Sequence, residues 1–150
     1  MTSELIDTNV LVYSVAASAP QRIASRSLID KAKDPSVGFY VFPHILAEFF
    51  AIVTNPKRVS PAKTPQEALV VIEQFLALPG LTLLPLPASV VARWIQLIRL
   101  RPVKGGKVFD LQTAAGMLIY GMGTIYTYNL ADFQGIPGIT PKEPPSLANP

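Results

Sequence analysis

Short apolar runs alternate with longer amphipathic stretches along most of the chain, a pattern that predicts strands separated by helices. The apolar runs predict strands over 4–6, 38–42, 81–86 and 124–127, and a last short strand near Ile139. The stretches between them predict helices over 10–16, 20–33, 44–54, 65–78, 89–100 and 108–120. Because strands and helices alternate, we expect an α/β fold with a mostly parallel central sheet of four to five strands, flanked by helices.

Turn and capping residues support this division. Pro43 suits the first turn of the helix that follows it, and Thr64 to Glu67 reads as a capping box with a first-turn proline. The chain contains no internal repeat. We therefore expect a single domain over 1–141, followed by a proline-rich tail over 142–150.

The composition narrows the class of protein. Apolar residues make up 49% of the chain and charged residues only 15%, which excludes a disordered protein or a coiled coil. There is no cysteine and a single histidine, His44, so thiol catalysis, a histidine-dependent triad and a multi-histidine zinc site are excluded. The net charge of +3 is compatible with a polyanionic partner without requiring one.

Two apolar stretches superficially resemble export or membrane segments. Residues 5–19 end in small side chains, but no Lys or Arg precedes them, and Asp7 and Asn9 interrupt the apolar run. Residues 81–98 contain two prolines and an arginine, which a membrane-spanning helix rarely accommodates together. We therefore expect a soluble, cytoplasmic protein.

Two acidic residues stand out by their positions. Asp7 directly follows the first predicted strand, where ligands bind in open α/β sheets, although an aspartate there can equally cap the next helix. Glu48 lies in a helix that is apolar almost all round. A carboxylate there needs a cation, a proton or an ion pair, and the alternative to a functional role is a salt bridge to a distant Lys or Arg, or to His44.

Two further acids are predicted to reach the same edge of the sheet. Asp110 opens the helix over 108–120, where it could instead complement the helix dipole. Asn129 and Asp132 follow the strand over 124–127, where an Asx turn is the alternative. Converging carboxylates repel one another, so this set makes chemical sense mainly around a hard cation such as Mg²⁺ or Mn²⁺.

Four short segments occur in an order that is typical of one nuclease family. They are Asp7-Thr8-Asn9, Leu46-Ala47-Glu48-Phe49, Phe109-Asp110-Leu111-Gln112-Thr113-Ala114-Ala115 and Thr127-Tyr128-Asn129-Leu130-Ala131-Asp132-Phe133. Together they resemble the ordered motifs of PIN-domain ribonucleases, in particular VapC-type toxins of bacterial toxin–antitoxin pairs. The resemblance spans roughly residues 4 to 140.

The resemblance implies a metal-dependent hydrolysis of RNA phosphodiester bonds. It makes Asp7, Glu48 and Asp110 the acids that hold Mg²⁺ or Mn²⁺, with Asp132 completing the catalytic set. It also implies that four residues orient these carboxylates by hydrogen bonds, namely Thr8, Asn9, Thr127 and Asn129. Many relatives have an acid where this chain has Asn129, so the number of metal ions stays open.

Basic residues flank the predicted site, and the family implies further partners. One group just before Asp110 is predicted to contact RNA phosphates, and consists of Arg99, Arg101, Lys104 and Lys107. A second group comprises Lys57, Arg58 and Lys63, for which ordinary solvated loops are an equal alternative. The resemblance also implies a homodimer and a cognate antitoxin protein. Two other functions stay open: a PIN-fold module that binds RNA or protein without cutting, and a different Mg²⁺ enzyme.

Overall fold

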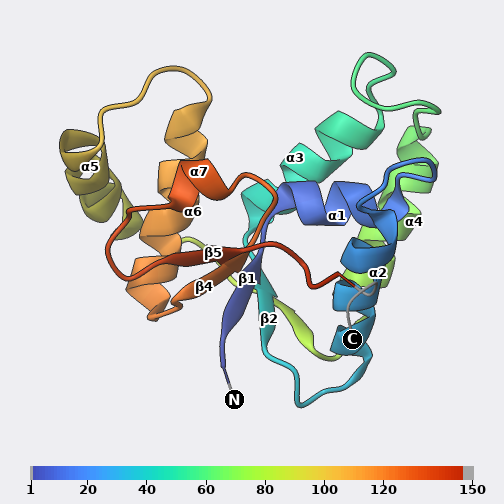
Figure 1. Cartoon of the computed structure of the whole chain (residues 1–150), viewed down its shortest axis with the longest axis horizontal. Coiled ribbons are helices and arrows are strands. Elements are labelled where there is room, and N and C mark those ends of the chain that lie inside the picture. The colour runs from blue at the N-terminus through green and yellow to red at the C-terminus, as the bar shows by residue number, and fades with distance from the viewer. Residues whose placement is uncertain (1, 147–150) are drawn as a thin grey trace.

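The computed structural model, which describes residues 2–146, has a five-stranded parallel sheet at its centre (Figure 1). The strand order is β3-β2-β1-β4-β5, and every neighbouring pair is parallel. The strands are β1 (Glu4–Ile6), β2 (Phe39–Val41), β3 (Leu81–Leu83), β4 (Thr124–Tyr126) and β5 (Thr140–Lys142). The structure confirms the predicted α/β fold with a parallel sheet.

The strand order creates a reversal point between β1 and β4. From β1 the chain builds outward to β3, then returns to place β4 on the other side of β1. Glu4 of β1 is in register with Phe39 of β2 and with Thr124 of β4. In open α/β sheets, the carboxyl ends of the strands at such a point form the usual ligand site, so residues that follow β1 and β4 are well placed for function.

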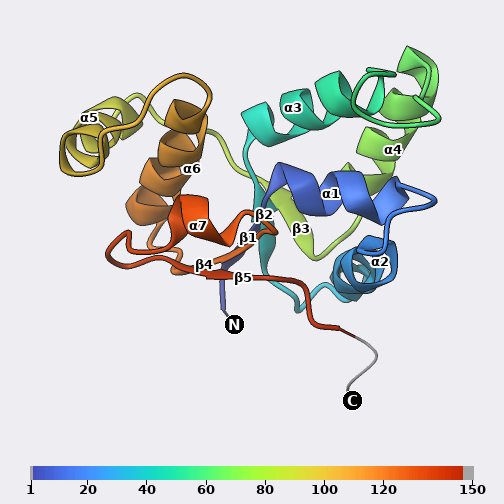
Figure 2. The ribbon, with the colours of Figure 1, turned by 45° about the horizontal axis from the view of Figure 1, so that its top comes forward.

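Helices gather in two groups on either side of the sheet (Figures 1 and 2). One group contains α1, which packs against α2 and α3, and α4, which packs against α3; in the other group, α6 packs against α5 and α7. The helices are α1 (Thr8–Val15), α2 (Arg22–Asp30), α3 (Pro43–Val53), α4 (Pro65–Leu76), α5 (Val90–Leu100), α6 (Lys107–Tyr120) and α7 (Leu130–Phe133), and a 3-10 turn (Lys31–Lys33) follows α2.

Local sequence signals explain several helix ends. The capping box of α4 is present, with the Thr64 hydroxyl accepting from the Glu67 amide and the Glu67 carboxylate accepting from the Thr64 amide. Helix α6 ends at Gly121, which has a φ of 72° that favours glycine. Within α6, Gly116 is buried, and a Cβ there would lie 2.8 Å from the ring of Phe42. The small residues of α6 therefore let this helix approach the loop that follows β2.

The structure confirms the short strand predicted near Ile139, which is β5 (Thr140–Lys142). This strand includes Lys142, which the prediction places in the tail. The Thr127 amide donates to the Lys142 carbonyl, so this residue belongs to the sheet. Pro141 is the reason that the strand is predicted to end early, although a proline fits an edge strand whose second side is open. Residues 147–150 of the predicted tail lie outside the described residues.

Two further elements also differ. Helix α7 lies where no helix is predicted, and β3 ends at Leu83 instead of residue 86. Pro85 and Pro87 have no amide hydrogens to donate. The backbone hydrogen bonds to β2 therefore end with the one from the Leu84 amide to the Val41 carbonyl. No helix within residues 2–146 is long and apolar enough to cross a membrane.

Candidate active site

Asp7 occupies the carboxyl end of β1 and is only 5% exposed. One carboxylate oxygen, Oδ1, accepts the Thr8 amide at 2.8 Å, which makes Asp7 the cap of α1. The other, Oδ2, accepts the Thr127 hydroxyl at 2.9 Å and the Asn9 side-chain amide at 3.2 Å. The Asp7 side chain therefore caps α1 and also belongs to the candidate site, two roles that the sequence presents as alternatives.

The donors to Asp7 are themselves fixed by the end of β4. The Asn9 carbonyl oxygen accepts the Tyr128 amide at 2.9 Å, and its amide nitrogen lies 3.1 Å from the Thr127 hydroxyl. That hydroxyl also accepts the Asn129 amide at 3.0 Å. The ends of β1 and β4 are thus tied together around one carboxylate, which leaves Asp7 little freedom to rotate.

Glu48 faces this region from α3. Its Oε2 accepts the Thr8 hydroxyl at 3.0 Å, so Thr8 bridges α1 and α3. The alternative of a structural ion pair for Glu48 is not supported, because no Lys, Arg or His within residues 2–146 pairs with it. His44, one candidate for that pair, instead bonds the Thr113 hydroxyl at 2.7 Å.

Asp110 and Asp132 complete the acidic group from the other side of the sheet. Asp110 lies in the first turn of α6, and Asp132 lies on α7. The side chains of these two residues share a hydrogen bond. Lys107 Nζ is 4.0 Å from Asp132 Oδ1. A hollow of about 110 Å³ is lined by both acids together with Lys107 and Arg101.

The four acids affect one another electrostatically. Burial raises the pKa of Asp7 even though three hydrogen bonds oppose the increase. Burial, helped by the charge of Asp7, also raises the pKa of Glu48. Burial raises the pKa of Asp110 to about 7, and the charges of Asp7, Asp132 and Glu48 add to the increase. These carboxylates together therefore bring more negative charge into the site than the protein alone can easily stabilise.

The donor chemistry of this group fits a hard divalent cation. Carboxylate oxygens are the ligands that Mg²⁺ and Mn²⁺ prefer, and a cation would offset the repulsion that raises the pKa of Asp110. Within residues 2–146, however, no three acidic or histidine side chains stand close enough to enclose an ion as they are oriented. The residue types therefore suit the metal, while their side chains would have to turn toward it.

The remaining predicted residues have varied surroundings. Asn129 is exposed and lies at the start of α7. Its backbone amide takes part in the network around Asp7 by donating to the Thr127 hydroxyl. Arg99, Lys104 and Lys107 are exposed. Arg101 differs from the prediction, because its guanidinium donates to the carbonyls of Ala131 and Gln134 and so holds the end of α7.

Two features of the site were not predicted from the sequence. The ion pair between Lys107 and Asp132 joins residues 25 positions apart, and only the packing of α7 on α6 brings them together. The Tyr128 amide that holds Asn9 is a backbone group, which leaves no signal in the sequence. Burial lowers the pKa of His44, which favours the neutral form of its imidazole.

Comparison with known proteins adds independent information. The family model described as "PIN domain" matches residues 5–137. No curated protein sequence matches the chain. The solved structures that resemble it include VapBC2 from Rickettsia felis bound to a promoter DNA fragment, with a TM-score of 0.67 and 19% identity over 95% of this chain and 98% of the other.

Two more solved structures are similar. Mycobacterium tuberculosis VapC20, described as a toxin that cleaves the sarcin-ricin loop, has a TM-score of 0.68 and 17% identity, covering 93% of this chain and 100% of its own. DNA-bound VapBC from Salmonella typhimurium has a TM-score of 0.65 and 22% identity over 95% of this chain and 98% of the other. At these identities the similarity establishes the fold, over nearly the whole length of each chain.

Proposed function

The chain belongs to the PIN domain family, and from that membership we propose that it is a metal-dependent endoribonuclease and the toxin of a toxin–antitoxin pair. The observation that carries this proposal is the gathering of Asp7, Glu48, Asp110 and Asp132 at the reversal point of the sheet, where burial and the charges of the other three acids raise the pKa of Asp110. The similar VapC20 structure, described as a sarcin-ricin loop cleaving toxin, supports the toxin part of the proposal.

Asp7, Glu48 and Asp110 are the side chains proposed to hold Mg²⁺ or Mn²⁺, and Asp132 borders the same site. The bound ion would stabilise the negative charge that develops on the phosphate during hydrolysis. The chain itself prepares the ligands for this role. Three donors hold Asp7 at the end of β1 and the Thr8 hydroxyl holds Glu48, so these contacts keep both carboxylates at the edge of the sheet where the ion would bind, although the group as a whole would still have to turn toward it.

The proton of the attacking water needs an acceptor within the same group. Asp110 is one proposed acceptor, because its half-buried carboxylate lines the hollow between α6 and α7. Asp7 is the alternative acceptor, although its three donors already occupy it. His44 is a poor candidate, since its Nε2 bonds Thr113 and burial lowers its pKa.

Exposed cations next to the acids supply the proposed contacts to RNA. Lys107 lines the same hollow as Asp110, and Lys104 and Arg99 are exposed nearby along the chain. A phosphate backbone can be held there by charge alone, without reading the base sequence. Arg101 is left out of this set because its guanidinium already binds two carbonyls of the α7 region.

The proposed partners are a cognate antitoxin and a second copy of the chain. Similar structures include toxin–antitoxin complexes from Salmonella typhimurium and Klebsiella pneumoniae. Helix α5 exposes Val91 and Ile95 one turn apart, and Leu100 at its end, which are apolar side chains that a partner surface could cover. Because its substrate would be cellular RNA, the proposal places the enzyme in the cytoplasm.

The test is cleavage of a mixed RNA pool by the purified protein in Mg²⁺ or Mn²⁺, with EDTA as the control. Single-stranded DNA and small phosphate esters are run beside the RNA to determine the substrate class. We expect RNA fragments that depend on the metal. Failure to cut RNA while still binding it would favour a non-catalytic binding module, and cutting only DNA or small esters would indicate a different Mg²⁺ enzyme.

A further inference from the structure

The four acids of the candidate site come from two separate groups of helices. Asp7 caps α1 and Glu48 lies on α3, in one group, whereas Asp110 and Asp132 lie on α6 and α7, in the other. Figure 2 shows the two groups on opposite sides of the molecule. An ion that binds carboxylates from both groups therefore depends on how far apart the two groups are held.

A hydrogen bond joins the two groups at the first turn of α3, which is the part of that helix nearest α6 (Figures 1 and 2). There His44 Nε2 lies 2.7 Å from the hydroxyl oxygen of Thr113 on α6. Thr113 is buried, and its hydroxyl donates to the Phe109 carbonyl at 3.2 Å. Because the hydroxyl hydrogen is used there, the His44 Nε2–H is the donor to Thr113. A neutral histidine therefore makes the bond between the two helix groups.

This hydrogen bond lies one helical turn from two of the acids. His44 and Glu48 are four residues apart on α3, and Thr113 and Asp110 are three residues apart on α6, so each pair shares a helix face. The bond therefore joins the face that carries Glu48 to the face that carries Asp110. A change in its length would move the two carboxylates relative to one another.

The surroundings of the His44 ring fix its orientation. The ring stacks on Phe42 with the ring centroids 6.0 Å apart, and Phe42 stacks in turn on Tyr120 of α6, also at 6.0 Å. The second ring nitrogen, Nδ1, is buried and has no hydrogen-bond partner within residues 2–146. A buried nitrogen without a partner lowers stability, so an apolar side chain would fill this position at least as well. The histidine is better explained by the bond that its Nε2–H makes.

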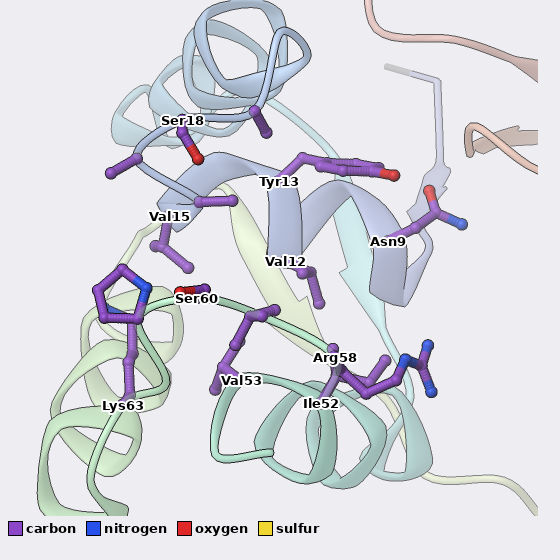
Figure 3. A pocket seen from close by; sticks show the side chains of 15 residues that line it. Asn9, Val12, Tyr13, Val15, Ser18, Ile52, Val53, Arg58, Ser60 and Lys63 are labelled. Atoms are coloured by element: carbon purple, nitrogen blue, oxygen red, sulfur yellow. The ribbon is translucent and has the colours of Figure 1, made fainter. Parts of the chain in front are cut away.

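The other end of α3 is less tightly packed. A cavity of about 420 Å³ lies between α1 and the last turn of α3, where it is lined by Val12 of α1 and by Ile52 and Val53 of α3 (Figure 3). Side chains beside an open space lose packing contacts, so α1 holds this end of α3 less firmly. The position of α3 relative to α6 then depends largely on the contacts of its first turn.

We propose that the hydrogen bond from His44 to Thr113 sets the separation of Glu48 from Asp110, which makes His44 a positioning residue for the divalent ion; this inference rests on the proposed ribonuclease function. With the bond in place, the two carboxylates have only to turn toward the ion, because their helices are already held. Without it, binding of the ion must also fix the two helix groups, and this ordering weakens the binding.

Four substitutions separate the hydrogen bond from the fold. His44→Phe keeps a flat ring beside Phe42 and removes both the donor and the unpartnered Nδ1. His44→Gln is the conservative variant, because a glutamine amide can place its NH₂ group where Nε2 of the histidine lies. Thr113→Val removes the acceptor. Its matched control is Thr54→Val, since the Thr54 hydroxyl bonds the Phe50 carbonyl one turn back, as the Thr113 hydroxyl does in its own helix.

The first measurement is the affinity for Mn²⁺, by titration calorimetry on the full chain without RNA. We expect His44→Phe and Thr113→Val each to bind Mn²⁺ about 10-fold more weakly, and His44→Gln and Thr54→Val to stay within about twofold of the unaltered protein. The double variant His44→Phe/Thr113→Val should bind no more weakly than the single variants, since both act through one bond. His44→Phe should unfold at about the same urea concentration as the unaltered protein, so lost stability would not explain the weaker binding.

The second measurement reports the distance between the two helix groups. The chain has no cysteine, so spin labels at two exposed positions, Ala51→Cys on α3 and Gln96→Cys on α5, form one defined pair. Helix α5 packs on α6 and so reports the position of that group. We expect the distance distribution from double electron–electron resonance to be narrow in the otherwise unaltered protein and with His44→Gln, and broader with His44→Phe.

Several results would overturn the proposal. An Mn²⁺ affinity that His44→Phe leaves unchanged would do so, whatever the label distances show. Weaker binding with an unchanged distance distribution would also contradict it, since the separation would then not be the cause. The same holds if His44→Gln binds as weakly as His44→Phe, or if the double variant binds about 100-fold more weakly than the unaltered protein.

The two measurements also distinguish this inference from the proposed function. An unaltered protein that neither binds Mn²⁺ nor cuts RNA would contradict the ribonuclease, and broader label distances with His44→Phe would still support the role of the bond in holding the two carboxylates. Metal-dependent RNA cleavage by the unaltered protein, with an Mn²⁺ affinity and label distances that His44→Phe leaves unchanged, would contradict the positioning role alone.

Discussion

The carboxyl group of Asp110 destabilises the metal-free fold when it is ionised, and this has a measurable consequence. Burial and three neighbouring carboxylates raise its pKa from 3.8 to about 7. Because the pKa in the folded state lies above that in the unfolded state, the free energy of unfolding falls as the pH rises from about 4 to about 7 and is level above that. Asp110→Asn removes this loss, since the amide stays neutral and can still donate a hydrogen bond to Asp132.

The size of the effect follows from the pKa. If the whole increase in the pKa of Asp110, from 3.8 to about 7, acted on stability, it would lower the free energy of unfolding by roughly 4 kcal/mol. Asp110 is only half-buried, and water screens part of the repulsion, so we expect about 1–2 kcal/mol. The variant should therefore be more stable than the unaltered protein by about 1–2 kcal/mol at about pH 8, and by much less at about pH 4.

Urea unfolding in EDTA, followed by circular dichroism at both pH values, measures the difference directly. Glu73→Gln, at an exposed acid on α4, is the control and should change stability by less than about 0.5 kcal/mol at either pH. Adding Mg²⁺ should reverse the order at high pH, because an ion that binds the folded protein stabilises it by mass action and needs Asp110 to do so. An Asp110→Asn variant that is equally stable, or less stable, at high pH would refute this account of the site.

Other predictions concern packing, the orientation of the carboxylates and the role of one arginine. Gly116→Ala should lower the free energy of unfolding by about 1–3 kcal/mol, because its methyl group would meet a buried phenyl ring, whereas Gly106→Ala, with no atom within 4 Å of its added methyl, should be nearly neutral in the same denaturation assay. Thr127→Val removes a donor to Asp7 and should weaken Mn²⁺ binding about 10- to 100-fold by titration calorimetry, with unchanged affinity counting against the positioning role. Arg101→Gln should lower the free energy of unfolding by about 1 kcal/mol and leave the salt dependence of RNA binding unchanged. A weaker dependence of RNA binding on salt in this variant would instead show that Arg101 contacts RNA phosphates.

Much of the fold could be predicted from the sequence because its signals are local. The capping box at Thr64 and the first-turn Pro43 each mark a helix start, and the structure has helices beginning at residues 43 and 65. The extent of strand β5 is underestimated because Pro141 argues against a strand, and only its pairing with β4 overrides that local preference. The short helix α7 is not predicted, since Arg101 holds it from a distant part of the chain.

The candidate site was predictable in its residue types and less so in its contacts. Asp7 and Glu48 stood out because a carboxylate after a strand, or inside an apolar helix, has few structural explanations. Arg101 and Lys107 looked equivalent in the sequence, yet one binds backbone carbonyls and the other faces Asp132. Which cation is free to meet a phosphate depends on tertiary packing, which spacing along the chain does not encode.

The central claim is that the gathered carboxylates form one site that cuts RNA with a divalent ion. The most direct measurement is the rate of RNA cleavage in Mn²⁺ for three neutral variants, Asp7→Asn, Glu48→Gln and Asp110→Asn, beside Glu73→Gln, with each fold checked by circular dichroism. We predict that each of the three loses about 100-fold or more in rate, as expected when a metal ligand is removed, while Glu73→Gln keeps full activity. Cleavage that persists in EDTA, or that survives the loss of any two of the three carboxylates, would contradict the claim.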